Sequence, residues 1–239
     1  MAEELYRRYR PTKLSQVVGQ EETVTVLKQM LVKGDLPHVL LLSGPSGCGK
    51  TTIARILAGR VGCDKNDFHE VNCAMVEKPL DYIRYVSSNL GNSGMFSKFR
   101  AWLLDEAQSF SRAGFTQQAM LKMLEDTPKH VYFFLCTTDP SKLHRTIRSR
   151  CTPFALKAIS KTVLDKLLRE TAEKEGATPP ISDEVVNKII ELSEGSAREA
   201  LQFLGKVVQT DDEEKRLACI QKTDFEELGK SLAQILMSW

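Results

Sequence analysis

Short apolar runs alternate with helical patterns through the first two thirds of the chain. Three of these runs, at residues 39–43, 101–105 and 131–137, are continuously apolar and end in small or polar residues. A run without alternation is typical of a strand covered on both faces, as in a parallel sheet. The pattern therefore predicts an α/β fold with a parallel-sheet core, and such sheets bind ligands at the ends of their strands.

The pattern changes after residue 154, where strand-like runs stop and helical periodicity continues alone. Three amphipathic helices are expected at residues 160–174, 182–192 and 196–208, with Gly176 closing the first and Ser182 or Asp183 beginning the second. The polar stretch 209–216 suggests a linker, and 217–237 a last helical segment. We predict a sheet domain at 1–156, a three-helix lid domain at 157–208, and a linker with a C-terminal helical segment at 209–239.

Composition is that of an ordinary globular protein, with 42% hydrophobic and 27% charged residues. No apolar run approaches the ~18 residues that a membrane-spanning helix needs, and the N-terminus lacks the apolar segment of a secretory signal. We expect a cytoplasmic protein with no membrane partner. The net charge of +2 means that any nucleic-acid surface has to be a local patch.

Six cysteines raise the question of disulfides or a metal site. They include no CxxC pair, so their spacing gives no indication of a zinc site. Because no export signal is present, we expect reduced, structural thiols.

The strongest chemical motif follows the first predicted strand. Residues 44–51 match G-x-x-x-x-G-K-[ST] at every fixed position, between an apolar strand and a helical pattern. Glycines let backbone N–H groups point at phosphate oxygens, and the following helix N-terminus adds positive potential. We expect Lys50 to reach the β- and γ-phosphates of ATP and Thr51 to bind Mg²⁺. The predicted nucleotide-binding residues of the loop are Gly44, Pro45, Ser46, Gly47, Cys48, Gly49, Lys50, Thr51 and Thr52.

A second element complements the loop. The apolar run at 101–105 ends in Asp105, which is followed directly by Glu106. An acidic residue delivered to the edge of the sheet near the phosphates is suited to hold the Mg²⁺ shell. Glu106 is the candidate general base for the attacking water. Acidic residues also end many buried strands, so this indication depends on its pairing with the phosphate loop.

Two threonines, Thr137 and Thr138, close the third predicted strand. A hydroxyl at this position is suited to contact the γ-phosphate or the attacking water. The β-propensity of threonine explains the same pair equally well. The spacing alone leaves both interpretations open.

These motifs, together with several short ones, make the chain resemble the clamp-loader group of AAA+ ATPases from about residue 5 to about residue 205. The chain opens with Tyr9-Arg10-Pro11 and Val17-Val18-Gly19-Gln20, as that family does. The similarity continues in Thr137-Thr138-Asp139-Pro140, Ser149-Arg150-Cys151 and Gly195-Ser196-Ala197-Arg198. The resemblance implies a P-loop AAA+ core, with a RecA-like nucleotide-binding domain and a helical lid.

The resemblance also implies roles for individual positions. Thr138 corresponds to the sensor that contacts the γ-phosphate, and Arg198 to a second sensor on the lid. Arg150 corresponds to an arginine finger that completes the ATP site of a neighbouring subunit, a role suited to its permanently charged planar fork. The residues expected around adenine are Tyr9, Arg10, Pro11, Val17 and Val18.

The family implies three kinds of partner: other AAA+ subunits in an oligomer, expected to be a pentamer, a sliding clamp, and primer-template DNA. The DNA is held through its backbone without sequence preference. The candidate DNA contacts are Arg84, Ser111, Arg112 and Lys122. Met95 and Phe96, in a loop with flanking glycines, are the candidate clamp contacts. For each DNA candidate, the alternative is an ordinary solvated surface charge. For Met95 and Phe96, the alternative is ordinary packing within the loop.

Two features depart from the family pattern. Bacterial members carry a four-cysteine zinc module before the acidic strand, where this chain has Cys63 and Cys73, so we predict no zinc. The family also has a helical collar domain, which we expect to be reduced or truncated here. The predicted activity is hydrolysis of ATP to ADP and phosphate, coupled to clamp loading. The alternatives are another DNA-linked AAA+ ATPase, such as a helicase loader, and a nucleotide-binding scaffold that does not hydrolyse ATP.

Overall fold

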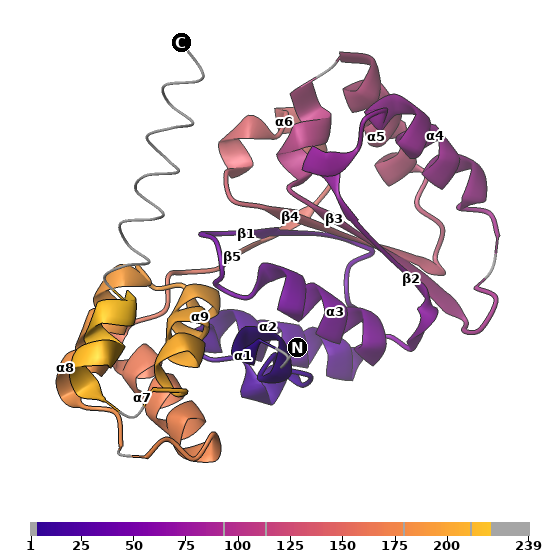
Figure 1. Ribbon diagram of the computed structural model, residues 1–239. Coiled ribbons are helices and arrows are strands. Elements are labelled where there is room, and N and C mark those ends of the chain that lie inside the picture. Colours follow the sequence, from indigo (N-terminus) through magenta and orange to yellow (C-terminus); the bar gives the residue numbers. More distant parts are fainter. Residues whose placement is uncertain (1–3, 93, 113, 179, 211, 221–239) are drawn as a thin grey trace, which may run out of the picture. The chain divides into compact units, whose positions relative to one another are not determined.

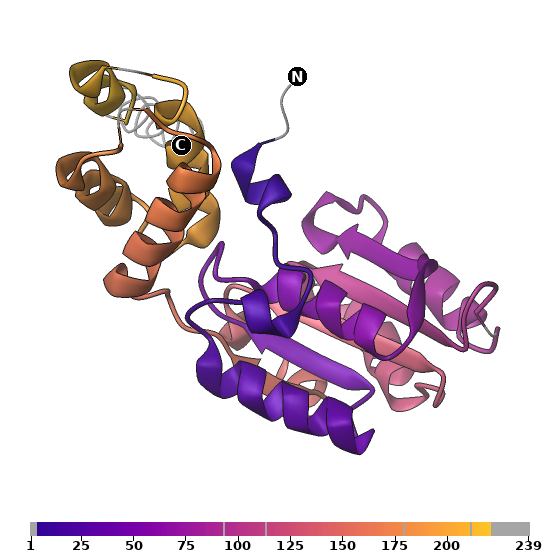
Figure 2. The same ribbon diagram turned by 90° about the horizontal axis from the view of Figure 1, so that it is seen from below.

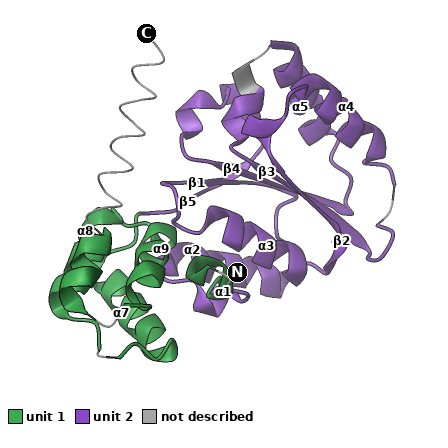
Figure 3. Ribbon diagram, viewed as in Figure 1, with its two compact units in different colours: residues 1–10, 158–239 green, residues 11–157 purple. Residues whose placement is uncertain are grey.

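The structure is a computed structural model that describes residues 4–92, 94–112, 114–178, 180–210 and 212–220. The chain divides into two compact units, one of residues 11–157 and one of residues 1–10 with 158–239 (Figure 3). The first contains the sheet, and the described part of the second is helical. We call them the sheet unit and the helical unit.

Five parallel strands form one sheet in the described part of the sheet unit, in the order β2-β3-β4-β1-β5 (Figure 1). The three predicted strands are confirmed as β1 (Val39–Ser43), β3 (Phe99–Asp105) and β4 (Val131–Thr137). They occupy the middle of the sheet, which explains their continuous apolar character. The pattern missed the two edge strands, β2 (Cys63–Asn72) and β5 (Thr152–Ala155). The predicted α/β fold is confirmed.

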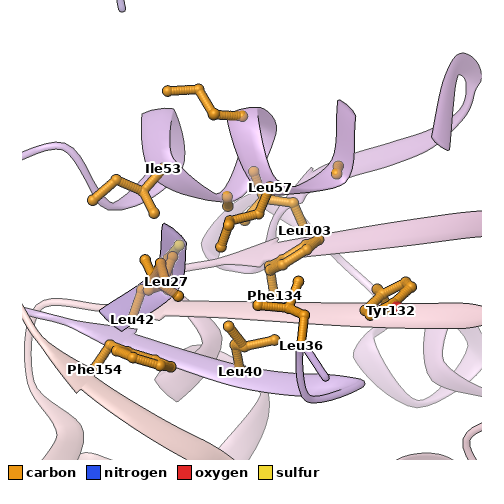
Figure 4. Close-up of a cluster of buried hydrophobic side chains, with 14 of the residues drawn as sticks. Leu27, Leu36, Leu40, Leu42, Ile53, Leu57, Leu103, Tyr132, Phe134 and Phe154 are labelled. Carbon is orange, nitrogen blue, oxygen red and sulfur yellow. The ribbon is translucent and has the colours of Figure 1, made fainter. Parts of the chain in front are cut away.

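Alternate residues of the central strands feed two separate cores. Leu40, Leu42 and Phe134 belong to the core beneath α2 (Glu21–Lys33) and α3 (Lys50–Arg60), which Figure 4 shows in close-up. Figure 2 looks onto this face of the sheet. The opposite core packs beneath α4 (Pro79–Asn89), α5 (Gly114–Glu125) and α6 (Arg145–Arg148). The two cores fix the central strands, and with them the ends that carry the site.

The helical unit contains α7 (Lys161–Lys174), α8 (Asp183–Leu192) and α9 (Ala197–Val207), which confirms the three predicted helices to within one residue at each end. The Ser182 hydroxyl accepts a hydrogen bond from Val185 N, and the Ser196 hydroxyl from Glu199 N, so both serines are N-caps. Residues 213–220 are also helical, so a helix begins inside the stretch expected to be a linker.

The N-terminal residues lie with the helices, whereas the sequence assigned them to the sheet domain. Helix α1 (Leu5–Arg8) packs against α9, where Leu5 lies over Gly205. Arg8 and Tyr9 both contact the Glu175 carboxylate just after α7. These contacts join segments far apart in the chain, so the local pattern carries no sign of them.

Candidate active site

The phosphate loop connects β1 to α3 at the carboxyl edge of the sheet. Gly49, the N-cap of α3, has a φ of 106°, and open space surrounds the position of a Cβ there. A side-chain residue rarely adopts this conformation, so glycine is what lets the loop turn into the helix. The free N–H groups at the start of α3 then face the loop, where they are suited to bind phosphate oxygens.

The other end of the loop is fixed by close packing. A Cβ on Gly44, which has a φ of 147°, would lie 2.4 Å from the carbonyl oxygen of Leu156. Leu156 N donates to Ser43 O at 2.7 Å, and Gly44 N donates to Thr137 O at 3.2 Å. The loop therefore begins in contact with the last residue of β4 and with the residue that follows β5.

Lys50 is buried, and its ammonium group donates to the carbonyl oxygens of Gly44 at 2.7 Å and Pro45 at 2.8 Å. These bonds hold the charged end of the side chain against the first residues of the loop. A lysine in this position places positive charge where a bound phosphate chain would lie.

Thr51 and Asp105 come together at the edge of the sheet. The Thr51 hydroxyl donates to Asp105 Oδ2 at 3.0 Å, and Glu106 N donates to Asp105 Oδ1 at 3.1 Å. Both residues belong to the predicted Mg²⁺ site, and their hydroxyl and carboxylate oxygens are ligands that Mg²⁺ prefers. Glu106 follows with a φ of 52°, an uncommon conformation for a residue with a side chain.

The two candidate sensor threonines occupy different environments. Thr137 is fully buried, and its hydroxyl donates to Gln108 Oε1 at 2.6 Å while accepting from Asp139 N at 3.1 Å. Thr138, the position favoured by the family resemblance, is exposed. Of the two, Thr137 therefore joins the hydrogen-bonded network around Glu106.

Two glutamines of the site were missed as functional candidates. Gln20 is buried, where its Nε2 donates to Lys157 O at 2.7 Å and its Oε1 accepts from Lys157 N at 3.1 Å. It ties the chain after β5 to the segment before α2. Gln108 connects Thr137 to Glu106. The Val-Val-Gly-Gln motif marked Gln20 as part of the resemblance, but Gln108 carried no signal in the sequence.

The candidate arginine finger, Arg150, forms an ion pair within the sheet unit. Its Nε donates to Glu125 Oε1 at 2.7 Å, and its guanidinium also donates to Thr146 O at 2.9 Å. Glu125 is the last residue of α5. The guanidinium is thus oriented at the protein surface.

The remaining nucleotide-site candidates belong to two units. Arg198 is exposed in the first turn of α9, within the helical unit. Tyr9, in the same unit, donates its hydroxyl to Glu175, and this bond, with burial and the carboxylate charge, raises the pKa of Tyr9. Arg10 is half-buried there. Pro11, Val17 and Val18 lie in the sheet unit and are half-buried.

The candidate DNA contacts lie on or near helices of the sheet unit. Arg84 is exposed on α4, 3.8 Å from Asp81 Oδ1, and Lys122 is exposed on α5. Ser111 and Arg112 belong to the short helix η3 (Ala107–Arg112). For Ser111 and Arg112, the structure describes the backbone only.

The candidate clamp-contact loop is held by a buried carboxylate. Met95 and Phe96 are 86% and 63% exposed. Beneath them, Asp67 accepts hydrogen bonds from Met95 N at 2.8 Å, Phe96 N at 3.0 Å and the Ser97 hydroxyl at 2.8 Å. Burial acts to raise the pKa of Asp67, but these hydrogen bonds outweigh it and lower the pKa. The loop thus presents two apolar side chains on a fixed backbone.

This phosphate loop, with an acidic strand end beside it on a parallel sheet, defines a P-loop nucleotide-binding fold. Two solved structures of Thermotoga maritima RuvB share the fold. One, of a point mutant, has a TM-score of 0.70 and 21% identity over 90% of this chain and 73% of its own. The other, a Holliday junction branch migration motor, has a TM-score of 0.69 and 22% identity over 89% of this chain and 72% of its own.

Sequence comparisons relate the chain to subunits of DNA polymerase III. A family model described as DNA polymerase III, delta subunit matches residues 67–160, and one described as Sigma-54 interaction domain matches 17–90. The chain is 33% identical to DNA polymerase III subunit gamma of Buchnera aphidicola subsp. Schizaphis graminum, over 84% of this chain and 60% of the relative. It is also 33% identical to DNA polymerase III subunit tau of Escherichia coli, over 87% of this chain and 35% of the relative.

The chain spans between about a third and three fifths of the length of such relatives. Within the residues that the structure describes, no helix has both the length and the apolar character to cross a membrane.

Proposed function

We propose that this chain is the ATPase subunit of a clamp loader, which uses ATP binding and hydrolysis to load a sliding clamp onto primer-template DNA. One observation carries the proposal: the Thr51 hydroxyl is hydrogen-bonded to Asp105, next to Glu106, where the phosphate loop leads into α3. The similarity to DNA polymerase III gamma and tau subunits supports the same function.

The phosphate loop would bind the triphosphate through its N–H groups, and Lys50 would neutralise charge on the β- and γ-phosphates. The hydroxyl of Thr51 and the carboxylate of Asp105 would hold Mg²⁺, because they offer hard oxygen ligands next to each other. When bound, this ion supplies positive charge that stabilises the transferring phosphoryl group.

In the proposed reaction, Glu106 accepts a proton from water as the water oxygen forms a bond to the γ-phosphorus. The bond from the γ-phosphorus to the bridging oxygen breaks, and the electron pair leaves with ADP. The products are ADP, phosphate and the proton held by Glu106. The sensor role that the family assigns to Thr138 remains part of this proposal.

Two arginines would add charge from outside the loop. Arg150 would enter the ATP site of a neighbouring subunit, where its planar guanidinium stabilises charge on the transferring phosphoryl group. Arg198 lies in the first turn of α9, where the helix dipole disfavours a cation, so an anionic ligand accounts for its position. The adenine contacts would come from Tyr9, Arg10, Pro11, Val17 and Val18.

The proposed partners are other clamp-loader subunits in a pentamer, the sliding clamp and primer-template DNA. Arg84, Ser111, Arg112 and Lys122 are the proposed contacts to the DNA backbone. Met95 and Phe96 are the proposed clamp contacts, supported by their exposure and by the bonds from their N–H groups to Asp67. A fixed loop loses little conformational freedom when its apolar side chains enter a groove.

The experiment is ATP turnover per chain over a range of protein concentrations, with and without primed DNA and clamp. The proposal predicts a rate per chain that rises with concentration, increases with DNA and clamp, and collapses in Arg150→Ala. Arg148→Ala, which removes a nearby exposed arginine, is the matched control. A rate that is independent of concentration, DNA and clamp would contradict the proposed trans site and clamp loading. Nucleotide binding without turnover would favour the scaffold alternative.

A further inference from the structure

Gln108 is a buried amide that links two parts of the candidate active site. It lies in η3, directly after the acidic end of β3, and is 8% exposed. Its Oε1 accepts the hydroxyl of Thr137 at 2.6 Å, and its Nε2 donates to Glu106 Oε2 at 2.5 Å. Both ends of the side chain are therefore occupied by residues of the site.

The bonding pattern fixes the orientation of this amide. Asp139 N donates to the Thr137 hydroxyl at 3.1 Å, so the proton of that hydroxyl is directed at Gln108 Oε1. An ionised carboxylate only accepts hydrogen bonds, so the NH₂ group of Gln108 has to face Glu106. Reversing the amide would lose the bond to Glu106 and set two acceptors against each other.

The same chain of bonds continues to the phosphate loop. Thr137 O accepts from Gly44 N at 3.2 Å, which places Thr137 against the first residue of the loop. From Gly44, the path passes through Thr137 and Gln108 to the carboxylate of Glu106. Glu106 itself has a φ of 52°, a conformation that its surroundings have to stabilise.

We propose that Gln108 is a positioning residue, which holds the Glu106 carboxylate in a fixed place relative to the phosphate loop. The inference rests on the proposed function, because it takes Glu106 as the base. A general base has to lie within hydrogen-bond reach of the water whose proton it takes. Gln108 restricts where the carboxylate lies without contacting nucleotide or water itself.

The test uses Gln108→Met, which keeps the length of the side chain and removes both hydrogen bonds, and Gln108→Glu, which keeps an acceptor for Thr137 but replaces the donor to Glu106 with a second carboxylate. Misplacing a catalytic group by about 1 Å costs on the order of 100-fold in rate, so we expect kcat to fall about 10- to 100-fold in both variants. The nucleotide Kd of Gln108→Met, measured with a fluorescent ATP analogue, should stay within about twofold, because this uncharged variant does not alter the phosphate loop.

The decisive comparison repeats Gln108→Met in a Glu106→Gln background, with phosphate release followed over hours. A residue that acts through Glu106 has little further effect once that carboxylate is gone. Gln108→Met should therefore lower the rate of the Glu106→Gln variant by less than about twofold. Three results would overturn the inference. Gln108→Met could lower the rate equally in both backgrounds, it could leave kcat within about twofold of wild type, or it could weaken nucleotide affinity as much as it lowers kcat.

Two further measurements separate this inference from folding and from the proposed function. Thr137→Val removes the donor to Gln108 with little change in shape and should lower kcat in the same direction, whereas Thr137→Ser should retain it. If Glu106→Gln abolishes turnover while the Gln108 variants leave it intact, the inference fails and the proposed ATPase stands. If Glu106→Gln retains wild-type turnover, the proposed role of Glu106 as the base fails.

Discussion

The hydroxyl of Thr51 donates a 3.0 Å hydrogen bond to the carboxylate of Asp105, so the first turn of α3 is joined to the end of β3. The two residues come from separate elements, and the parallel sheet brings them together at one edge. This contact puts the two proposed Mg²⁺ ligands beside the phosphate loop. Mutation can remove each of these two oxygen ligands separately.

Removing either oxygen should impair the metal-dependent step. We expect Thr51→Val and Asp105→Asn each to lower ATP turnover on the order of 100-fold, because charge stabilisation at the phosphates is worth several kcal/mol. Thr51→Ser keeps the hydroxyl and serves as the control. Turnover is measured against Mg²⁺ concentration, and EDTA should abolish the wild-type activity. Wild-type turnover that persists in EDTA would contradict the assignment.

Glu125 should matter for the orientation of Arg150 more than for folding. Their ion pair is partly exposed, and such pairs contribute about 0–1 kcal/mol to stability. We therefore expect Glu125→Gln to change the free energy of unfolding by less than about 1 kcal/mol while lowering concentration-dependent ATP turnover several-fold. Urea unfolding and turnover are measured on the same preparations. Unchanged turnover would show that the finger does not depend on Glu125.

Asp67 should control both the stability and the partner affinity of the Met95–Phe96 loop. An amide at this position cannot accept all the bonds that the carboxylate accepts, and hydrogen bonds to a charged group contribute about 1.5–3 kcal/mol each. We expect Asp67→Asn to lower the free energy of unfolding by about 1–3 kcal/mol and to weaken clamp binding. Phe96→Ala should weaken clamp binding without the loss of stability. Phe115→Ala, at another exposed aromatic, is its control.

The contribution of Asp67 should depend on pH in a definite direction. Its pKa is lower in the folded protein than its usual value. The stabilisation is therefore present above the unfolded pKa of about 3.9 and is lost as pH falls through the lower folded value. The difference in unfolding free energy between wild type and Asp67→Asn should be constant near neutral pH and shrink below about pH 4. A difference that grows on acidification would contradict this assignment.

Two glycines should respond to alanine in opposite directions. Gly44→Ala forces a Cβ to within 2.4 Å of the Leu156 carbonyl at a positive φ, and we expect it to destabilise the protein by about 1–3 kcal/mol. Gly59 lies in α3 with open space around it, so Gly59→Ala should stabilise by about 0.5–1 kcal/mol. Thermal or urea unfolding measures both. Equal effects would mean that contact with Leu156 does not constrain the loop.

The sequence predicts the central strands and the capped helices well because local chemistry determines both. The run at Val131–Thr137 is buried on both faces, and serines begin α8 and α9. By contrast, β2 reads CDKNDFHEVN, with charged and polar residues at an edge of the sheet, and gives no continuous apolar run. The pairing of α1 with α9, which brings Leu5 against Gly205, joins segments far apart in the chain. A local pattern does not encode such contacts.

The same division holds within the site. Lys50, Thr51 and Asp105 stand at motif spacings, so the sequence alone identifies them as candidates. Gln108 becomes a candidate only through its partners, since an amide two residues after Glu106 is an ordinary surface residue in most sequences. Likewise, the different environments of Thr137, which is buried, and Thr138, which is exposed, become visible only in the structure.

The central claim is that this chain hydrolyses ATP with Glu106 as the base, and Glu106→Gln tests it most directly. The variant keeps the size of the side chain and removes its ability to take a proton. With primed DNA and clamp present, the account predicts that the variant binds ATP with wild-type affinity and that its turnover falls by about 100-fold or more, within the range of general-base effects. Wild-type turnover in Glu106→Gln would contradict it.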